Sequence, residues 1–326
     1  MTTLDVGRTR PRRLRPWAGR PEFAPLAFLV LLSIILAATT PAFLAVDNLV
    51  SIVAQVAVVG IVALACNTVI LAGEIDVSTG SLLAACSLVF GAVANSMGGV
   101  LLPAVAAAGA GVIVGFANGL LVTVGRIPSI IATLGMLLML RGLMLVKAAV
   151  GVISLPDPSR ALGLDFRFGL PVPVLILLGV YLAAEVFMRN TTVGRDILAI
   201  GSNGRAARFI GLPIGRVKLL CFVLTGLSCG LASGVFFGQI GQLQATAATG
   251  FELRVIAAVV LGGTSITGGR GSVVAPVLGA ILVGVILNAL TLNAVPETFE
   301  QFILGLLILV AISLDAIRHR IASRRA

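Results

Sequence analysis

Two carboxylates stand between two long apolar runs in the segment LAGEIDVSTGS, residues 71–81. Glu74 and Asp76 are the only charged residues in the stretch 49–125. Acids within a membrane are costly unless they face water or a partner, so these two could line a polar route or relay protons. Asp76 or Ser78 could also simply cap the helix that follows. Because glycines bracket the acids, we expect a broken or re-entrant helix here, and both interpretations of the acids stay open.

Composition decides what surrounds this motif. The chain has 326 residues, of which 58% are hydrophobic and 11% charged, and its mean hydropathy is +1.12. Soluble domains carry about 25% charged residues. Uncharged runs of 20 or more residues can cross a bilayer core of about 30 Å as helices, whereas a β-barrel would show short alternating strands. The sequence therefore predicts an all-α polytopic membrane protein.

About ten transmembrane helices are expected from the uncharged runs and their polar or Gly/Pro breaks. The run 77–125 is too long for one crossing and breaks near residues 95–99, which gives two spans. A further span, shorter than the others, is expected at 252–263. The other spans are expected at about 24–44, 49–71, 128–146, 170–188, 219–241, 272–291 and 296–314.

Lysine and arginine positions predict the orientation. With ten spans, eighteen basic residues fall on one side of the membrane and three on the other. The positive-inside rule places the richer side, and with it both termini, in the cytoplasm. Residues 1–22 are then a basic cytoplasmic lead-in, 23–315 a single transmembrane domain, and 316–326 a basic cytoplasmic tail. A cleaved signal peptide is not expected, because 23–46 is too long an uncharged core.

The sequence lacks the residues that several classes of functional site require. A zinc or Ser-His-Asp site has only His319 to use, so no catalytic or metal site is expected. The net charge of +10 is spread over chain ends and loops with one Trp and one Tyr, which argues against nucleic-acid binding. The Gly-rich stretch 262–272 lacks the Lys-Ser/Thr of a phosphate-binding loop, so we interpret it as a tight turn and expect no cofactor. The four cysteines lie in apolar runs and are expected to be buried thiols: Cys66, Cys86, Cys221 and Cys229.

The basic loop 189–218, RNTTVGRDILAIGSNGRAARFIGLPIGRVK, contains a helix-like core. Ser202 or Asn203 can cap a short helix, and Gly211 followed by a proline can end it. Its Ala206-Ala207 pair offers a low-relief face that could dock into a partner. The Ala-Ala-x-x-x-Gly spacing is similar to the ATPase-docking signature of ABC importer permeases. The residues with this expected coupling role are Arg195, Asn203, Arg205, Ala206, Ala207, Arg208 and Gly211.

Four wider stretches resemble one branch of that family, the permeases of ribose, xylose and related sugars. They are 72–84, 117–143, 191–218 and 250–290, in the family's order and approximate spacing. Arg254 departs from the pattern, since the family often has an acid there. The resemblance implies a multi-pass permease in the bacterial plasma (inner) membrane. It also implies a cytoplasmic ATP-binding subunit and an extracytoplasmic substrate-binding protein as partners.

The chain is only 5% aromatic, so it is poorly equipped to bind a sugar ring tightly, and the binding protein would carry affinity. A homodimer in membrane lipid is expected, because one chain has one docking loop and ATP-driven importers use two ATPase subunits. Alternatives are an ion-coupled secondary transporter using Glu74 and Asp76, an ABC permease for a non-sugar solute, and a scaffold without transport. The expected translocation pathway comprises Glu74, Asp76, Ser78, Asn67, Asn118, Thr133, Gln239 and Asn288.

Overall fold

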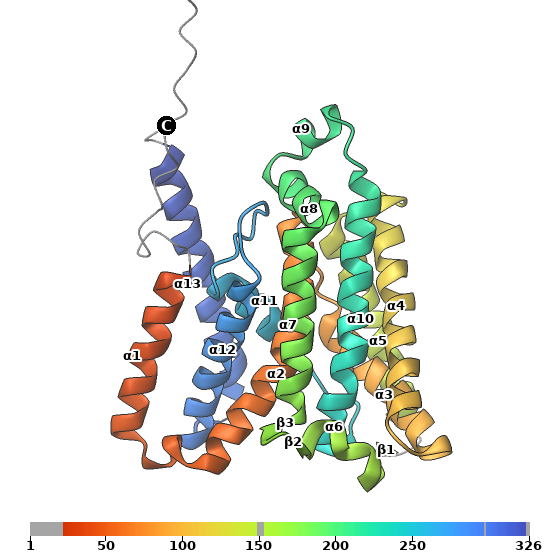
Figure 1. Cartoon of the computed structure of the whole chain (residues 1–326), viewed down its shortest axis with the longest axis vertical. Coiled ribbons are helices and arrows are strands. Elements are labelled where there is room, and N and C mark those ends of the chain that lie inside the picture. Colours follow the sequence, from red (N-terminus) through yellow and green to blue (C-terminus); the bar gives the residue numbers. More distant parts are fainter. Residues whose placement is uncertain (1–21, 149–152, 297, 324–326) are drawn as a thin grey trace, which may run out of the picture.

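The computed structural model describes residues 22–148, 153–296 and 298–323. Helices dominate these residues (Figure 1), as the composition predicts. Among them, seven helices are long and apolar enough to cross a membrane. They are α2 (Val46–Leu71), α3 (Thr79–Met97), α4 (Leu101–Thr123), α5 (Ser129–Ala148), α7 (Val172–Asn190), α10 (Ile214–Ile240) and α12 (Val274–Leu292).

Three further apolar helices occupy the other predicted spans. They are α1 (Phe23–Thr39), α11 (Phe251–Leu261) and α13 (Thr298–Ser323), whose apolar part is Phe299–Val310. The 11 residues of α11 rise only about 16 Å, roughly half of a bilayer core. The structure therefore supports seven spans within the described residues, while ten crossings and cytoplasmic termini stay predictions.

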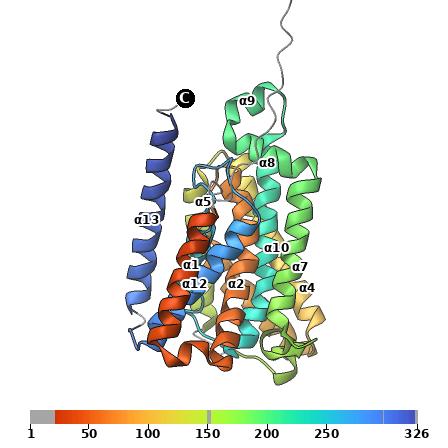
Figure 2. The same cartoon turned by 60° about the vertical axis from the view of Figure 1, so that its left-hand side comes forward.

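Short elements cap the two ends of the bundle. One end carries η2 (Pro41–Leu44), η3 (Asp157–Arg160) and α6 (Ala161–Leu164), with two antiparallel ribbons. In these ribbons β1 (Ile153–Ser154) pairs with β4 (Gln242–Leu243), and β2 (Phe166–Arg167) pairs with β3 (Leu170–Pro171). The other end carries α8 (Thr192–Ser202) and α9 (Gly204–Phe209), which make up most of the basic loop 189–218 (Figures 1 and 2).

Helix α2 runs through the centre of the bundle. Every residue from Val56 to Leu71 is buried, and α2 contacts α7, α10, α11 and α12. An all-round apolar helix is typical of such a central position. Beside it, α4 and α10 approach so closely that a Cβ at Gly111 or Gly226 would overlap the backbone of the opposite helix. Small residues allow this approach, because association within lipid depends on close packing.

Candidate functional site

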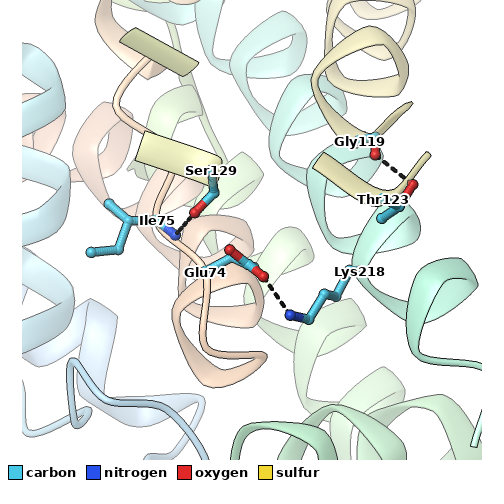
Figure 3. Close-up of polar contacts among 6 residues, drawn as sticks. All are labelled: Glu74, Ile75, Gly119, Thr123, Ser129 and Lys218. Carbon is cyan, nitrogen blue, oxygen red and sulfur yellow. Dashed lines mark hydrogen bonds and ion pairs between the residues drawn. The ribbon is translucent and has the colours of Figure 1, made fainter. Parts of the chain in front are cut away.

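The acidic motif forms an irregular linker, residues 72–78, between α2 and α3. Gly73 turns the chain with a φ of 79°, and residues 74–78 have no regular secondary structure. The N–H of Ile75 donates to Ser129 Oγ at 3.2 Å (Figure 3). The N–H of Val77 donates to Thr133 Oγ1 at 3.2 Å. The first turns of α5 therefore hold the linker, and the expected break between the two helices is confirmed.

Asp76 lies buried at the start of α3. Its Oδ1 accepts hydrogen bonds from the N–H of Ser78 at 2.8 Å and from Ser78 Oγ at 2.6 Å. Asn118 of α4 donates from Nδ2 to Ser78 Oγ at 2.9 Å. Asp76 thus organises the turn that starts α3, and its carboxylate lies at the positive end of that helix. Among the described residues, five buried polar atoms here have no hydrogen-bond partner: Asp76 Oδ2, Thr79 Oγ1, Ser81 Oγ, Asn118 Oδ1 and Glu252 Oε2, which lies against Gly80.

Glu74 forms an ion pair with Lys218, which lies in the first turns of α10 (Figure 3). Both side chains are mostly buried, with exposed fractions of 17% and 21%. The pair lines a pocket of about 560 Å³, which Arg126 and Arg208 also line. Neither arginine has an ion pair among the described residues. The pocket therefore concentrates positive charge around a single acid, which joins the linker to the end of the basic loop.

The short helix α9 is capped as the sequence predicts. Asn203 Oδ1 accepts from the N–H of Ala206 at 3.0 Å, and Gly211 follows the helix with a φ of 78°. One expectation is wrong: Ala207 is buried in the chain's own core, so it cannot be part of an exposed Ala-Ala face. The exposed apolar residues at this tip are Phe209 and Ile210. Arg195, Arg205, Ala206 and Arg208 are exposed around them, and their coupling role stays a prediction.

A second junction joins the basic loop to the body of the protein. A Cβ at Gly201, near the end of α8, would overlap the carbonyl oxygen of Leu71 at the end of α2. The same carbonyl accepts from the N–H of Gly269 at 2.9 Å, and Ser202 Oγ donates to the carbonyl of Gly269 at 3.2 Å. The Gly-rich stretch 262–272 is therefore a tight turn against α2 and α8, as expected.

Three other predicted pathway residues, Asn67, Gln239 and Asn288, form hydrogen bonds to neighbouring elements and none to Asp76. Asn67 Oδ1 accepts from Thr264 Oγ1 at 2.8 Å. Gln239 Nε2 donates to the carbonyl of Ala54 at 2.9 Å. Asn288 Nδ2 donates to Asn48 Oδ1 at 2.7 Å, and Asn48 donates in return at 3.2 Å. Such bonds hold helices together in a membrane, and a pathway role for these three residues stays a prediction.

A polar segment that was not predicted as part of the site, residues 242–250, lies between α10 and α11. Arg141 of α5 donates from Nη1 to the carbonyls of Ala245 at 3.1 Å and Ala247 at 2.8 Å. The signal that could have found this site is the arginine itself, since a charge within a span needs a partner.

Comparison with known proteins agrees with this architecture. A family model described as branched-chain amino acid transport system / permease component matches residues 48–312. The chain belongs to this permease family. The ribose import permease protein RbsC of Escherichia coli K12 is 38% identical over 324 residues, which cover 97% of this permease and 99% of the relative. RbsC of Bacillus subtilis is 34% identical, covering 94% and 96% of the two chains.

A third relative of the permease is the autoinducer 2 import system permease protein LsrC of Klebsiella pneumoniae. It is 35% identical, covering 90% of this chain and 86% of the relative. No solved structure matched the permease.

Arg254, where the permease departs from the resembling sequences, has a partner in this chain. Its Nη2 lies 2.8 Å from Glu300 Oε2 of α13. The pair joins α11 to α13, which otherwise stands at the edge of the bundle (Figure 2).

Proposed function

We propose that the chain is the membrane-spanning subunit of an ATP-driven importer for ribose or a similar small polar solute. Relatives named as ribose and autoinducer 2 import permeases, similar over most of their length, support this proposal. The sequence has no phosphate-binding loop, so a separate cytoplasmic subunit would bind and hydrolyse ATP. A separate extracytoplasmic binding protein would deliver the solute.

The observation that carries the proposal is a pair of contacts, which connect the loop 189–218 to the end of α2 and to the linker 72–78. The Gly201–Leu71–Gly269 backbone junction joins this loop to the end of α2. The Lys218–Glu74 ion pair joins the start of α10 to the linker that leads to Asp76. A push or pull on the loop would therefore move the linker, because the first contact is backbone against backbone and the second is an ion pair between two mostly buried side chains.

We place the loop 189–218 in the cytoplasm and the permease in the bacterial inner membrane. The eighteen-to-three distribution of basic residues supports this orientation, with ten crossings and both termini inside. Two copies of the chain would give two loops for two ATPase subunits. The exposed Phe209 and Ile210 are the apolar side chains that would insert into a partner's cleft.

The proposal is tested by reconstituting the permease with its ATPase and binding protein in proteoliposomes and measuring uptake of D-ribose. Uptake should require ATP. The Phe209→Ser variant should lose co-purification with the ATPase, because it removes the exposed apolar anchor. Phe168→Ser is the matched control, since Phe168 is 98% exposed at the opposite end of the bundle and should not affect ATPase binding.

Two results would contradict the proposal. One is uptake driven by an ion gradient without ATP, which would favour the secondary-transporter alternative with Asp76 or Glu74 as the ion-coupling acid. The other is full ATPase binding by the Phe209→Ser variant, which would show that the loop tip does not dock.

A further inference from the structure

The segment 242–250, QLQATAATG, connects α10 to α11 without regular structure beyond the two residues of β4. Gly241 and Gly250 bound it, with φ values of 69° and 77°. Its last part is a series of tight turns, such as the N–H of Ala247 to the carbonyl of Gln244 at 3.0 Å. The backbone is therefore fixed in place but irregular.

This segment lies beside the interior of a candidate membrane span. Arg141, which binds two of its carbonyls, stands twelve residues after Ser129 and five before Val146, the ends of that span. At the α-helical rise, these separations correspond to about 18 Å and about 7 Å along α5. At its far end the segment leads into Glu252, whose carboxylate would overlap a Cβ placed at Gly80 in the first turn of α3. Residues 242–243 therefore belong to the ribbon at the end of the bundle, and the residues from Ala245 to Gly250 lead from there to membrane depth.

Its outward side is polar. Gln242, Gln244, Thr246 and Thr249 are exposed, while Leu243 is buried. Among the hydrogen bonds of the described residues, the side chains of Gln244 and Thr246 take part in none, and Thr249 Oγ1 bonds only to the carbonyl of Thr246. Irregular backbone and unbonded amides at this depth are tolerated only against water or protein, because lipid tails offer no hydrogen-bond partner. This face therefore contacts either a water-filled route or a second copy of the chain, which would enclose such a route with it.

We infer that the segment 242–250 lines the solute route and presents neutral amide and hydroxyl groups to an uncharged, polyhydroxylated solute. The inference rests on the proposed importer function and adds residues to its pathway. The charges nearby do not face the solute: Arg141 binds the carbonyls of Ala245 and Ala247, and Glu252 Oε2 is buried. Arg141 is a positioning residue that fixes the segment, and Gln244, Thr246 and Thr249 face the solute.

Accessibility of single cysteines to a charged, membrane-impermeant methanethiosulfonate reagent tests the inference. The four native cysteines are buried, so the parent chain gives a low background in the assembled importer. The Thr246→Cys variant should react at least about tenfold faster than Leu182→Cys, because a charged reagent reaches water-lined sites and not lipid-facing ones. Leu182 is the matched control, an exposed apolar residue within the span α7.

A second measurement concerns the solute. The Thr246→Val variant keeps the shape of the side chain and removes its hydroxyl. It should raise the KM for D-ribose about fivefold, as expected for the loss of one neutral hydrogen bond. The Thr246→Cys reaction should also slow when D-ribose and ATP are supplied together.

The outcomes separate this inference from the proposed function. Labelling needs no knowledge of the solute, so fast labelling of Thr246→Cys in an assembly that does not take up ribose supports the route while contradicting the ribose proposal. If Thr246→Cys and Gln244→Cys are as unreactive as Leu182→Cys in an importer that takes up ribose, the inference is overturned and the proposed function stands.

Discussion

The Glu74–Lys218 ion pair should be needed to couple ATP hydrolysis to uptake. Neutralising Glu74 leaves Lys218, Arg126 and Arg208 around one pocket without an acid. Exposed pairs are worth about 0–1 kcal/mol, and breaking a fully buried pair costs about 3–5 kcal/mol. Because both side chains here are about one-fifth exposed, we expect Glu74→Gln to weaken the junction by about 2 kcal/mol, a factor of about 30 in its population.

The assay measures D-ribose uptake and ATP hydrolysis in the same proteoliposomes. Glu74→Gln should keep ATP hydrolysis and reduce uptake per ATP by roughly 5- to 30-fold. Lys218→Gln should have a smaller effect, because Arg126 and Arg208 line the same pocket and can approach Glu74. The exchanged variant Glu74→Lys with Lys218→Glu should recover part of the coupling.

A matched control comes from another ion pair of the same chain. Glu185 and Arg189 pair at 2.5 Å within α7, but the arginine side chain is 74% exposed. Such helical pairs are worth about 0.3–0.5 kcal/mol, so Glu185→Gln should leave coupling near the parental value. The reasoning is refuted if Glu74→Gln couples as well as the parent, or if Glu185→Gln loses as much.

Two predictions concern packing. Gly111→Ala should lower the thermal unfolding temperature of the purified permease, because the added methyl group overlaps the carbonyl of Gly226. Such overpacking costs about 1–3 kcal/mol of stability. The control is Gly109→Ala on the same helix, whose added methyl group meets no atom and which should be neutral or stabilising. Arg254→Gln should loosen α13, seen as faster proteolysis of the C-terminal helix, because it leaves Glu300 without its partner; exchanging the two residues should restore resistance, and equal proteolysis of all variants would contradict a role for the pair.

Much of the fold could be predicted from local sequence, because the hydropathy of a segment depends only on the residues of that segment. The break within 77–125 was predicted near residues 95–99, and α3 ends at Met97 with Gly98 after it. The linker at 72–78 was predicted from glycines and acids that sit next to each other in the chain. The short length of α11 was also predicted, at 252–263 against the observed Phe251–Leu261. The sequence could not show whether this run crosses the membrane, because an apolar half-helix looks like a short span until its surroundings are known.

The loop 189–218 shows a finer limit of prediction from the sequence. Sequence limited the cap to Ser202 or Asn203, of which the structure uses Asn203, and it predicted the end of the helix near Gly211. It could not show which alanine of the pair faces inward. Successive residues of a helix point about 100° apart, and here Ala207 turns toward the core of the chain while Ala206 stays exposed.

The segment 242–250 was missed because its partner is distant in sequence. Read alone, it is a short polar stretch between glycines, which is typical of a surface loop. Read alone, Arg141 is an unexplained charge in an apolar helix. The structure explains both features, because Arg141 binds carbonyls of this segment that are more than a hundred residues away in the sequence. The carbonyls of the segment satisfy the charge that lies within a span, and the exposed polar side chains of the same segment cannot face lipid, which is the physical reason to propose the solute route there.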